Sequence, residues 1–252
     1  MMERYALELI EHGKRVDKRK FDQFRDIEIK TGVISKAEGS AYVRIGKTQV
    51  IAGVKIGVGT PFSDSPNNGV LIVNTEFTPM ASPEFESGPP GENAVELARI
   101  VDRGIRESKS LETEKLVIVP GEKVWTVFVD IHIIDHQGNL IDAAALAAIN
   151  ALITAKLPKL EEGKVVAGEH GDKLPVAHKP VTVTVCKVGD NLFVDPAIEE
   201  ESVVESKVSI AVMEDGKICA IQKQGASGIA FNDLEAIVDL AIKKAGDLRK
   251  LM

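Results

Sequence analysis

Residues 123–157 read KVWTVFVDIHIIDHQGNLIDAAALAAINALITAKL and divide into two parts with different patterns. The first part, Lys123–Asp135, reads as a β-strand. The second part, Ile141–Leu157, is nearly all alanine, isoleucine and leucine on both sides, which predicts a helix buried in the core. The residues between them, Asp135–Asn139, have the composition of a turn. A strand that leads into a buried helix indicates a fold in which helices pack on β-sheets.

The chain on either side of this stretch repeats the same elements. Strands are predicted over Ile27–Ile34, Ser40–Ile45, Gln49–Val58, Val70–Thr78, Leu116–Val119, Val181–Val188, Leu192–Val194, Lys207–Met213 and Lys217–Gln222. Helices are predicted over residues 2–12, Glu92–Lys109 and about 232–250, the last opened by Asn232 or Asp233. Two of the strand pairs are joined by turns typical of hairpins, at Gly46-Lys47 and at Asp215-Gly216.

The order of these elements predicts an α+β fold of mostly antiparallel sheets with packed helices. Antiparallel strands followed by a long helix occur once before and once after a proline-containing stretch. We therefore expect a single domain, 1–252, whose two similar halves, about 1–157 and 180–252, are joined by residues 158–179. The loop over residues 79–91 is rich in proline, glycine and serine, and long loops in such domains are often functional.

The composition narrows the class of protein. Hydrophobic residues make up 44% and charged residues 27% of 252 residues, which excludes disordered and fibrous chains. The net charge of −7 argues against a protein that coats nucleic acid over its whole surface, although it permits one local basic site. Two cysteines without metal-like spacing, no long apolar run and no signal-peptide pattern lead us to expect a soluble, cytoplasmic protein.

Two groups of basic residues are candidates for binding phosphates. The first group contains five cations within seven residues: Lys14, Arg15, Lys18, Arg19 and Lys20. Composition alone favours a solvated loop in which these cations pair with nearby aspartates.

The second group is Arg99, Arg103 and Arg106, which share one face of the predicted helix because they are spaced i, i+4 and i+7. Three guanidinium groups on one rigid face suit a phosphate backbone, because each can hold phosphate oxygens in a forked pair of hydrogen bonds. Ion pairs within the helix are the alternative, since Glu96 precedes Arg99 by three residues and Asp102 precedes Arg106 by four. From the residues alone, the two interpretations are balanced.

Two further clusters resemble sites of metal binding or acid–base chemistry. The run Asp130, His132, Asp135 and His136, with Asp142, has suitable residue types, but alternation along a strand would point Asp130 and His132 to one side and Asp135 to the other. The acidic run Glu199, Glu200, Glu201 and Glu205 has the residues of a Mg²⁺ site, yet is more often a solvated loop, and Lys207 would neutralise part of it. We therefore predict no metal and no cofactor.

Several segments, taken in order, resemble the RNase PH family over nearly the whole chain. They are residues 13–19 with Arg25, 38–40, 46–50 with Ala52, 96–99, and Asp195 with the acidic run after it. The detail is most similar to the non-catalytic RNase PH-like subunits of exosomes. This resemblance implies a heterodimer with a catalytic RNase PH-like subunit, and three such heterodimers in a hexameric ring that degrades single-stranded RNA from its 3′ end with inorganic phosphate. RNA-binding cap proteins are further implied partners, and a membrane is not.

Two departures from the family pattern bear on catalysis. Active members carry a Gly-Gly-Ser/Thr-Arg segment that binds phosphate at the start of the alanine-rich helix, whereas this chain has Gly138, Asn139, Leu140 and Ile141. Active members also carry two aspartates six residues apart, which here are Glu201 and Lys207. We therefore expect no catalytic residues in this chain, and we expect Arg99, Arg103 and Arg106 to contact RNA phosphates near the partner's site.

Two alternatives remain at this point. The chain would be a phosphorolytic exoribonuclease in its own right if Asn139, Ser202 or backbone amides bound phosphate and Glu201 or Glu205 served as the acid. It would be a metal-dependent hydrolase if Asp130, His132 and Asp135 met in one site. The first predicts release of nucleoside diphosphates by the chain alone, and the second predicts an activity that a chelator removes.

Overall fold

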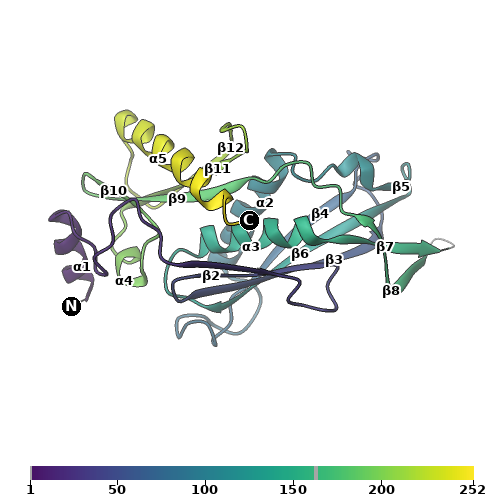
Figure 1. The fold of residues 1–252 in the computed structure, drawn as a ribbon, viewed down its shortest axis with the longest axis horizontal. Coiled ribbons are helices and arrows are strands. Elements are labelled where there is room, and N and C mark those ends of the chain that lie inside the picture. Colours follow the sequence, from purple (N-terminus) through teal and green to yellow (C-terminus); the bar gives the residue numbers. More distant parts are fainter. Residues whose placement is uncertain (1, 162–163) are drawn as a thin grey trace.

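The larger of the sheets forms one side of the protein (Figure 1). The structure, a computed structural model, describes residues 2–161 and 164–252. In this sheet the strands lie in the order β1-β2-β3-β6-β4, and β5 also pairs with β6. Their bounds are β1 Ile27–Thr31, β2 Gly39–Ile45, β3 Thr48–Gly59, β4 Val70–Glu76, β5 Val117–Val119 and β6 Lys123–Asp135. All pairs are antiparallel except β4 with β6, which run parallel.

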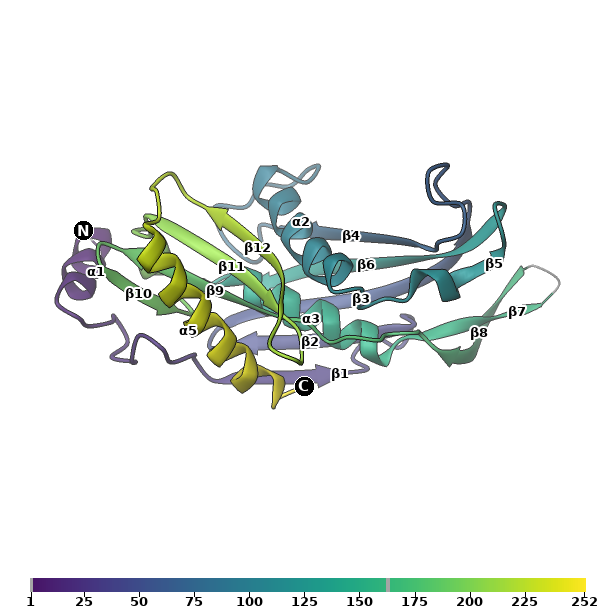
Figure 2. The ribbon, with the colours of Figure 1, turned by 90° about the horizontal axis from the view of Figure 1, so that it is seen from above.

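A second sheet is built from the last third of the chain. Its order is β10-β9-β11-β12, all antiparallel, with bounds β9 Val181–Val188, β10 Asn191–Val194, β11 Ser206–Val212 and β12 Ile218–Gln224. A separate hairpin, β7 Lys156–Glu161 with β8 Lys164–Lys173, extends from one end of the protein in both ribbon views (Figures 1 and 2). The mostly antiparallel α+β architecture predicted from the sequence is confirmed.

Two of the helices lie between the larger sheet and the second sheet, and the C-terminal helix packs on the second sheet (Figure 2). The bounds of the helices are α1 Met2–Glu11, α2 Glu92–Glu107, α3 Leu140–Thr154, α4 Ile198–Glu201 and α5 Phe231–Arg249, with a 3₁₀ turn at Thr113–Leu116. Helix α3 packs on β2 and β3 of the first sheet and on β9 of the second, so it has no solvent-facing side. That position explains its composition, because every face of the helix buries apolar surface.

The N-terminal segment links the two sheets through hydrogen bonds and ion pairs of its arginines. Arg15 is buried and donates hydrogen bonds to Glu200, to the carbonyl oxygen of Val194 at 2.9 Å and to that of Asp195 at 2.7 Å. Arg25 pairs with Asp195 through its Nη2, 2.7 Å from Oδ1. The segment therefore runs from α1 across the end of the second sheet into β1 of the first (Figure 2).

Several predicted boundaries need correction. Strand β1 ends at Thr31, because Gly32 takes a positive φ of 69° and turns the chain. Residues 158–179 were expected only to connect the halves, yet they contribute most of the β7–β8 hairpin. Helix α5 begins after Ala230, so neither Asn232 nor Asp233 is its N-cap. Among the described residues, no helix combines the length and apolar character that a membrane crossing requires.

Candidate functional site

A cavity of about 240 Å³ lies at the N-terminus of α3, where segments from both sheets meet. Ile141, Glu201 and Lys207 all line it, although they come from α3, α4 and β11. These are the three side chains that the sequence resemblance aligns with the arginine and the two aspartates of active members. The two departures found separately in the sequence are therefore one feature of the structure. Its other walls are Phe77, Glu84, Phe85, Asn93, Glu96, Leu97, His136, Leu140 and Gln224.

An ion pair crosses this cavity. The ammonium Nζ of Lys207 lies 2.7 Å from Oε1 of Glu201, and the side chains are only 24% and 20% exposed. The other oxygen of Glu201 accepts a hydrogen bond of 3.2 Å from the backbone N–H of Asn139, the N-cap of α3. Burial lowers the pKa of Lys207, but the adjacent Glu201 carboxylate outweighs that effect and raises it. Lys207 is therefore charged at neutral pH, and its charge is paired with the Glu201 carboxylate.

Aromatic rings close the side of the cavity that faces the 79–91 loop. The ring of Phe85 stacks on His136, with centroids 5.4 Å apart and planes 13° apart, and it also contacts Phe77 at 4.5 Å. Burial lowers the pKa of His136, with the Glu201 and Glu84 charges opposing that effect. A neutral imidazole stacked between a ring and the turn holds the loop in place. It does not supply a cation to the cavity.

The turn before α3 depends on glycine at position 138. Gly138 has a φ of 93°, and a Cβ there would lie 2.3 Å from the carbonyl oxygen of Pro196. Its own carbonyl oxygen accepts hydrogen bonds from Thr48 Oγ1 at 2.6 Å and Arg25 Nη2 at 3.1 Å. Both the conformation and the close approach exclude any side chain. The turn is thus pressed against the start of α4, which brings Glu201 to Asn139.

A network of buried hydrogen bonds around Asn139 lies next to the cavity. The amide of Asn139 donates to Asp142 at 3.1 Å and to Asp195 at 2.9 Å. Burial raises the pKa of Asp142 to about 8, and the nearby Asp195 charge adds to the rise. Burial acts in the same direction on Asp195, but its hydrogen bonds to Arg25 hold its pKa below the ordinary value. Asp142 is therefore mostly protonated at neutral pH, while Asp195 is ionised.

The N-terminal basic cluster is mainly structural. Arg15 is buried against Glu200, and Arg19 pairs with Asp17 and lies 2.8 Å from Asp195. The expected pairing of this cluster with nearby aspartates is confirmed for Arg19, which pairs with Asp17, whereas Arg15 pairs with Glu200 in the second half of the chain. These guanidinium groups are occupied by carboxylates within the protein, which leaves them little capacity for an external phosphate.

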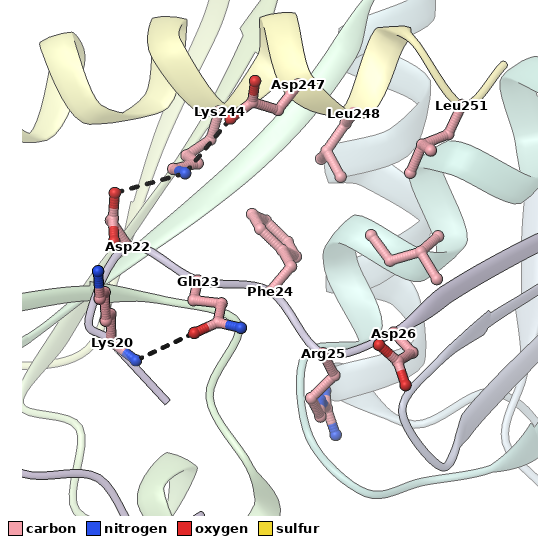
Figure 3. Close-up of a pocket in the computed structure, with 11 residues that line it drawn as sticks. Lys20, Asp22, Gln23, Phe24, Arg25, Asp26, Lys244, Asp247, Leu248 and Leu251 are labelled. Carbon is pink, nitrogen blue, oxygen red and sulfur yellow. Dashed lines mark hydrogen bonds and ion pairs between the residues drawn. The ribbon is translucent and has the colours of Figure 1, made fainter. Parts of the chain in front are cut away.

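A second hollow, of about 600 Å³, lies between residues 20–27 and the end of α5 (Figure 3). Its floor includes Phe24, Leu248 and Leu251, and Lys244 bridges Asp22 and Asp247 across one side. Basic and acidic side chains are balanced around it, so it does not form a concentrated anion site.

Of the three arginines on the exposed face of α2, Arg106 is held in an ion pair, whereas Arg99 and Arg103 are not paired among the described residues. Arg106 donates to Asp102 at 2.7 and 3.0 Å and to the carbonyl oxygen of Leu71 at 3.2 Å. Arg99 and Arg103 are exposed, and within residues 2–161 and 164–252 neither side chain has an ion pair or hydrogen bond. Glu96, the alternative partner of Arg99, instead lines the cavity. The ion-pair interpretation thus holds for Arg106, and the structure leaves the other two available.

The remaining clusters do not form a metal site. His132 lies 3.2 Å from Glu76 of β4, and Asp130 accepts a hydrogen bond from Asn74, while Asp135 is contacted by Gln137. No group of three or more potential ligands that could hold a metal ion occurs in the described part of the chain. The acidic run is also divided, because Glu200 faces Arg15, Glu201 faces Lys207, and Glu205 is exposed.

Some residues of the cavity were not found by reading the sequence. Asn93, Phe85 and Gln224 carry no motif, and the 79–91 loop that contains Phe85 was singled out only by its length and composition. The contact of Glu201 with Asn139 spans 62 residues, and no local pattern indicates it.

Comparisons with known proteins agree with this architecture. Two family models match the chain, "3' exoribonuclease family, domain 1" over residues 23–158 and "3' exoribonuclease family, domain 2" over residues 178–244. The chain is 50% identical over 250 residues to "Exosome complex component Rrp42" of Thermococcus gammatolerans, covering 98% of this chain and 92% of that protein. It is 49% identical to the protein of the same name from Methanosarcina acetivorans, over 98% of this chain and 91% of that protein.

Solved structures show the same relationship in three dimensions. A chain of the "archaeoglobus fulgidus exosome with RNA bound to the active site" superposes with a TM-score of 0.93 at 48% identity, covering 99% of this chain and 96% of that one. A chain of an "Archaeal exosome core" gives 0.88 at 45% identity, over 99% and 95% of the two chains. With two family models and relatives that match along the whole length, this chain belongs to the 3′ exoribonuclease, or RNase PH, family.

Proposed function

We propose that this chain is a non-catalytic subunit of an exosome, the 3′-to-5′ RNA-degrading ring. In this proposal it forms a heterodimer with a catalytic RNase PH-like subunit, and three heterodimers close into a hexameric ring in the cytoplasm. RNA-binding cap proteins complete the assembly, and single-stranded RNA is the substrate. The names of its relatives support the assignment to an exosome, since those that match nearly the whole chain are called exosome components.

The observation that supports the non-catalytic assignment is the set of side chains that line the cavity at the N-terminus of α3. Phosphorolysis requires a place for inorganic phosphate beside the 3′ end of RNA. Here the wall of the cavity carries Ile141, which donates no hydrogen bond, and the only cation among its lining residues, Lys207, is already paired with Glu201. A carboxylate at the same helix N-terminus also repels a phosphate electrostatically.

The contribution to RNA binding is assigned to the exposed face of α2. Arg99 and Arg103 are exposed and held on one rigid helix, which makes them suited to contact RNA phosphates that enter the partner's site. Arg106 is a weaker contributor in this proposal, because Asp102 holds its guanidinium group and raises its pKa.

Degradation of RNA in the presence of phosphate tests the proposal directly. The assay uses three samples: this chain alone, the catalytic subunit alone, and the two combined. We expect the chain alone to release no nucleoside diphosphates, and the mixture to be the most active sample. Phosphate-dependent release by the chain alone would establish the alternative, an active exoribonuclease.

The arginine assignment has its own test in the assembled ring. The double substitution Arg99→Ala with Arg103→Ala should weaken RNA binding and lower the slope of log affinity against log salt by about 1.4, because each phosphate contact to a single strand contributes about 0.7. Arg4→Ala on α1 is the matched control, since Arg4 is exposed and pairs with Glu8 on the same helix. An unchanged salt slope in the double variant would rule out these arginines as phosphate contacts.

A further inference from the structure

The segment between α1 and β1 directs its arginines into the protein and its lysines toward solvent. Arg15 and Arg19 are both engaged by carboxylates of the protein. The lysines that stand beside them in the sequence, Lys14, Lys18 and Lys20, are all exposed. Within residues 2–161 and 164–252, none of these three ammonium groups has an ion pair or a hydrogen bond. We refer to the three together as the lysine strip.

The aspartates of the same segment do little to neutralise this strip. Of the three in residues 13–26, Asp17 is paired with Arg19, and Asp22 is shared by two lysines of α5 at 3.4 and 3.5 Å. The third, Asp26, adjoins β1 and lies six residues beyond Lys20. The strip therefore presents unpaired positive charge on a chain whose net charge is −7.

The backbone that carries the strip is held in place. The N–H of Lys18 donates to the carbonyl oxygen of Arg15 at 3.1 Å, and Lys18 takes a φ of 64°, which is uncommon for a residue with a side chain. The N–H of Gln23 donates to the carbonyl oxygen of Lys20 at 3.1 Å, and the Arg19 guanidinium group donates to the carbonyl oxygen of Gln23 at 2.8 Å. Because the backbone is already ordered, a ligand of the lysines does not have to order it on binding.

The exposed surface of the segment suits a polyanion better than a protein. The fully exposed residues within 13–20 are one glycine, one aspartate and the three lysines, and none is apolar. Protein interfaces have an apolar core and are depleted in lysine. Phosphates of a nucleic acid require only positive charge, and the flexible stem of lysine lets its ammonium group follow a phosphate backbone of any sequence.

The strip is also separate from the arginines of α2. In both ribbon views α1 and the start of the following segment lie at the end of the protein opposite the β7–β8 hairpin, whereas α2 lies nearer the middle (Figures 1 and 2). Contacts at the two places would therefore be made by different nucleotides.

We propose that the lysine strip is a second contact of this chain with the phosphates of single-stranded RNA, independent of base sequence. The inference rests on the proposed function in one respect, which is that RNA is the substrate of the assembly. It does not depend on whether this chain is catalytic.

Binding of a fluorescein-labelled single-stranded oligouridylate to the purified full chain tests the inference. Fluorescence anisotropy measures the affinity over a range of salt concentrations. We expect the unaltered chain to bind at low salt, and the triple variant Lys14→Gln, Lys18→Gln and Lys20→Gln to bind more weakly. The slope of log affinity against log salt should become shallower by about 2 in the variant, because each phosphate contact to a single strand contributes about 0.7.

Two further triple variants separate local from general electrostatics. Lys36→Gln, Lys123→Gln and Lys173→Gln together are the matched control, since they remove the same charge from exposed lysines in three separate parts of the chain. This control should change the slope far less. Arginine at all three positions of the strip should restore the slope of the unaltered chain, because a guanidinium group also binds phosphate.

Circular dichroism checks that each variant is folded. Where the triple glutamine variant does not fold, Lys14→Gln with Lys20→Gln takes its place and leaves the left-handed position 18 unaltered. The slope should then become shallower by about 1.4.

Three results would overturn the inference: an unchanged slope in the strip variant, an equal change in the control, or no RNA binding by the unaltered chain at low salt. Loss of association with the catalytic subunit, with RNA binding unaltered, would instead assign the strip to a protein interface. The proposed function fails by a different result, phosphate-dependent RNA degradation by the chain alone, and that result would leave the measured slopes standing.

Discussion

Replacing Arg15 should destabilise the protein far more than replacing an exposed arginine. The side chains of Arg15 and Glu200 are both 0% exposed, and Arg15 also donates to two backbone carbonyl oxygens, those of Val194 and Asp195. Arg15→Met keeps most of the packing volume but leaves the Glu200 carboxylate buried without its counter-charge. Removing one partner of such a pair costs about 3–5 kcal/mol of unfolding free energy.

The size of the effect follows from what remains in the variant. Glu200 would keep hydrogen bonds from the backbone N–H groups of Val16 at 3.2 Å and Ala197 at 2.9 Å, so the charge is only partly compensated. Glu200→Gln alone leaves the guanidinium group buried and should cost a similar amount. The double variant removes both charges, so its cost should be less than the sum of the two single costs by more than about 1 kcal/mol.

Urea unfolding, followed by circular dichroism, measures these free energies. Arg4→Met is the matched control, because the Arg4–Glu8 pair has side chains 86% and 56% exposed and should contribute no more than about 0.5 kcal/mol. If Arg15→Met cost no more than Arg4→Met, or if the double variant were strictly additive, the buried pair would not be what fastens the N-terminal segment.

Three further predictions concern single positions. Asp142→Asn should flatten the pH dependence of stability, because a carboxyl whose pKa rises from 3.8 to about 8 on folding contributes stability that is complete below pH 3.8 and falls by about 1.4 kcal/mol per pH unit up to about pH 8. Urea unfolding at pH 5 and at pH 7 measures this, and the unfolding free energy of the unaltered chain should fall between the two pH values by more than that of the variant. An equal change in both proteins would contradict a buried, protonated Asp142. Gly138→Ala should lower the unfolding free energy by at least about 2 kcal/mol, measured in the same way, because the φ of 93° and the contact with Pro196 both oppose a Cβ; a neutral result would mean that the turn adjusts. Cys219 should react with a thiol reagent in the native protein while Cys186, fully buried with a raised pKa, reacts only on unfolding, and native labelling of Cys186 would show that β9 opens.

The sequence predicted a strand or helix best where a single local pattern of residues is sufficient to determine it. Strand β6 coincides with the predicted Lys123–Asp135, and α3 is as buried as its uniform alanine-rich composition indicates. The β7–β8 hairpin was missed because its segment is charged and contains Pro158, which reads as a connection. The parallel pairing of β4 with β6 was also beyond reach, since strand direction depends on how the chain crosses the sheet and not on residue type.

The site was partly predictable for a similar reason. Ile141 and Lys207 were identified one at a time by comparison with the family pattern, and the structure places both on one cavity. The charge relationship between Lys207 and Glu201 was foreseen only as partial neutralisation of an acidic run. Its partner at the helix start, Asn139, depends on the glycine turn at position 138 pressing against Pro196, which is a matter of tertiary packing.

The bond between Arg15 and Glu200 also has a consequence for the order in which the chain folds during synthesis. The two residues are 185 positions apart, so Arg15 leaves the ribosome long before its partner exists. At about 5–20 residues per second, the wait is roughly 10–40 seconds. During that time the segment around Arg15 lacks the Glu200 carboxylate against which the Arg15 guanidinium group is buried in the folded protein. It is therefore among the last parts of the protein to reach its final position, and the first sheet must form without it.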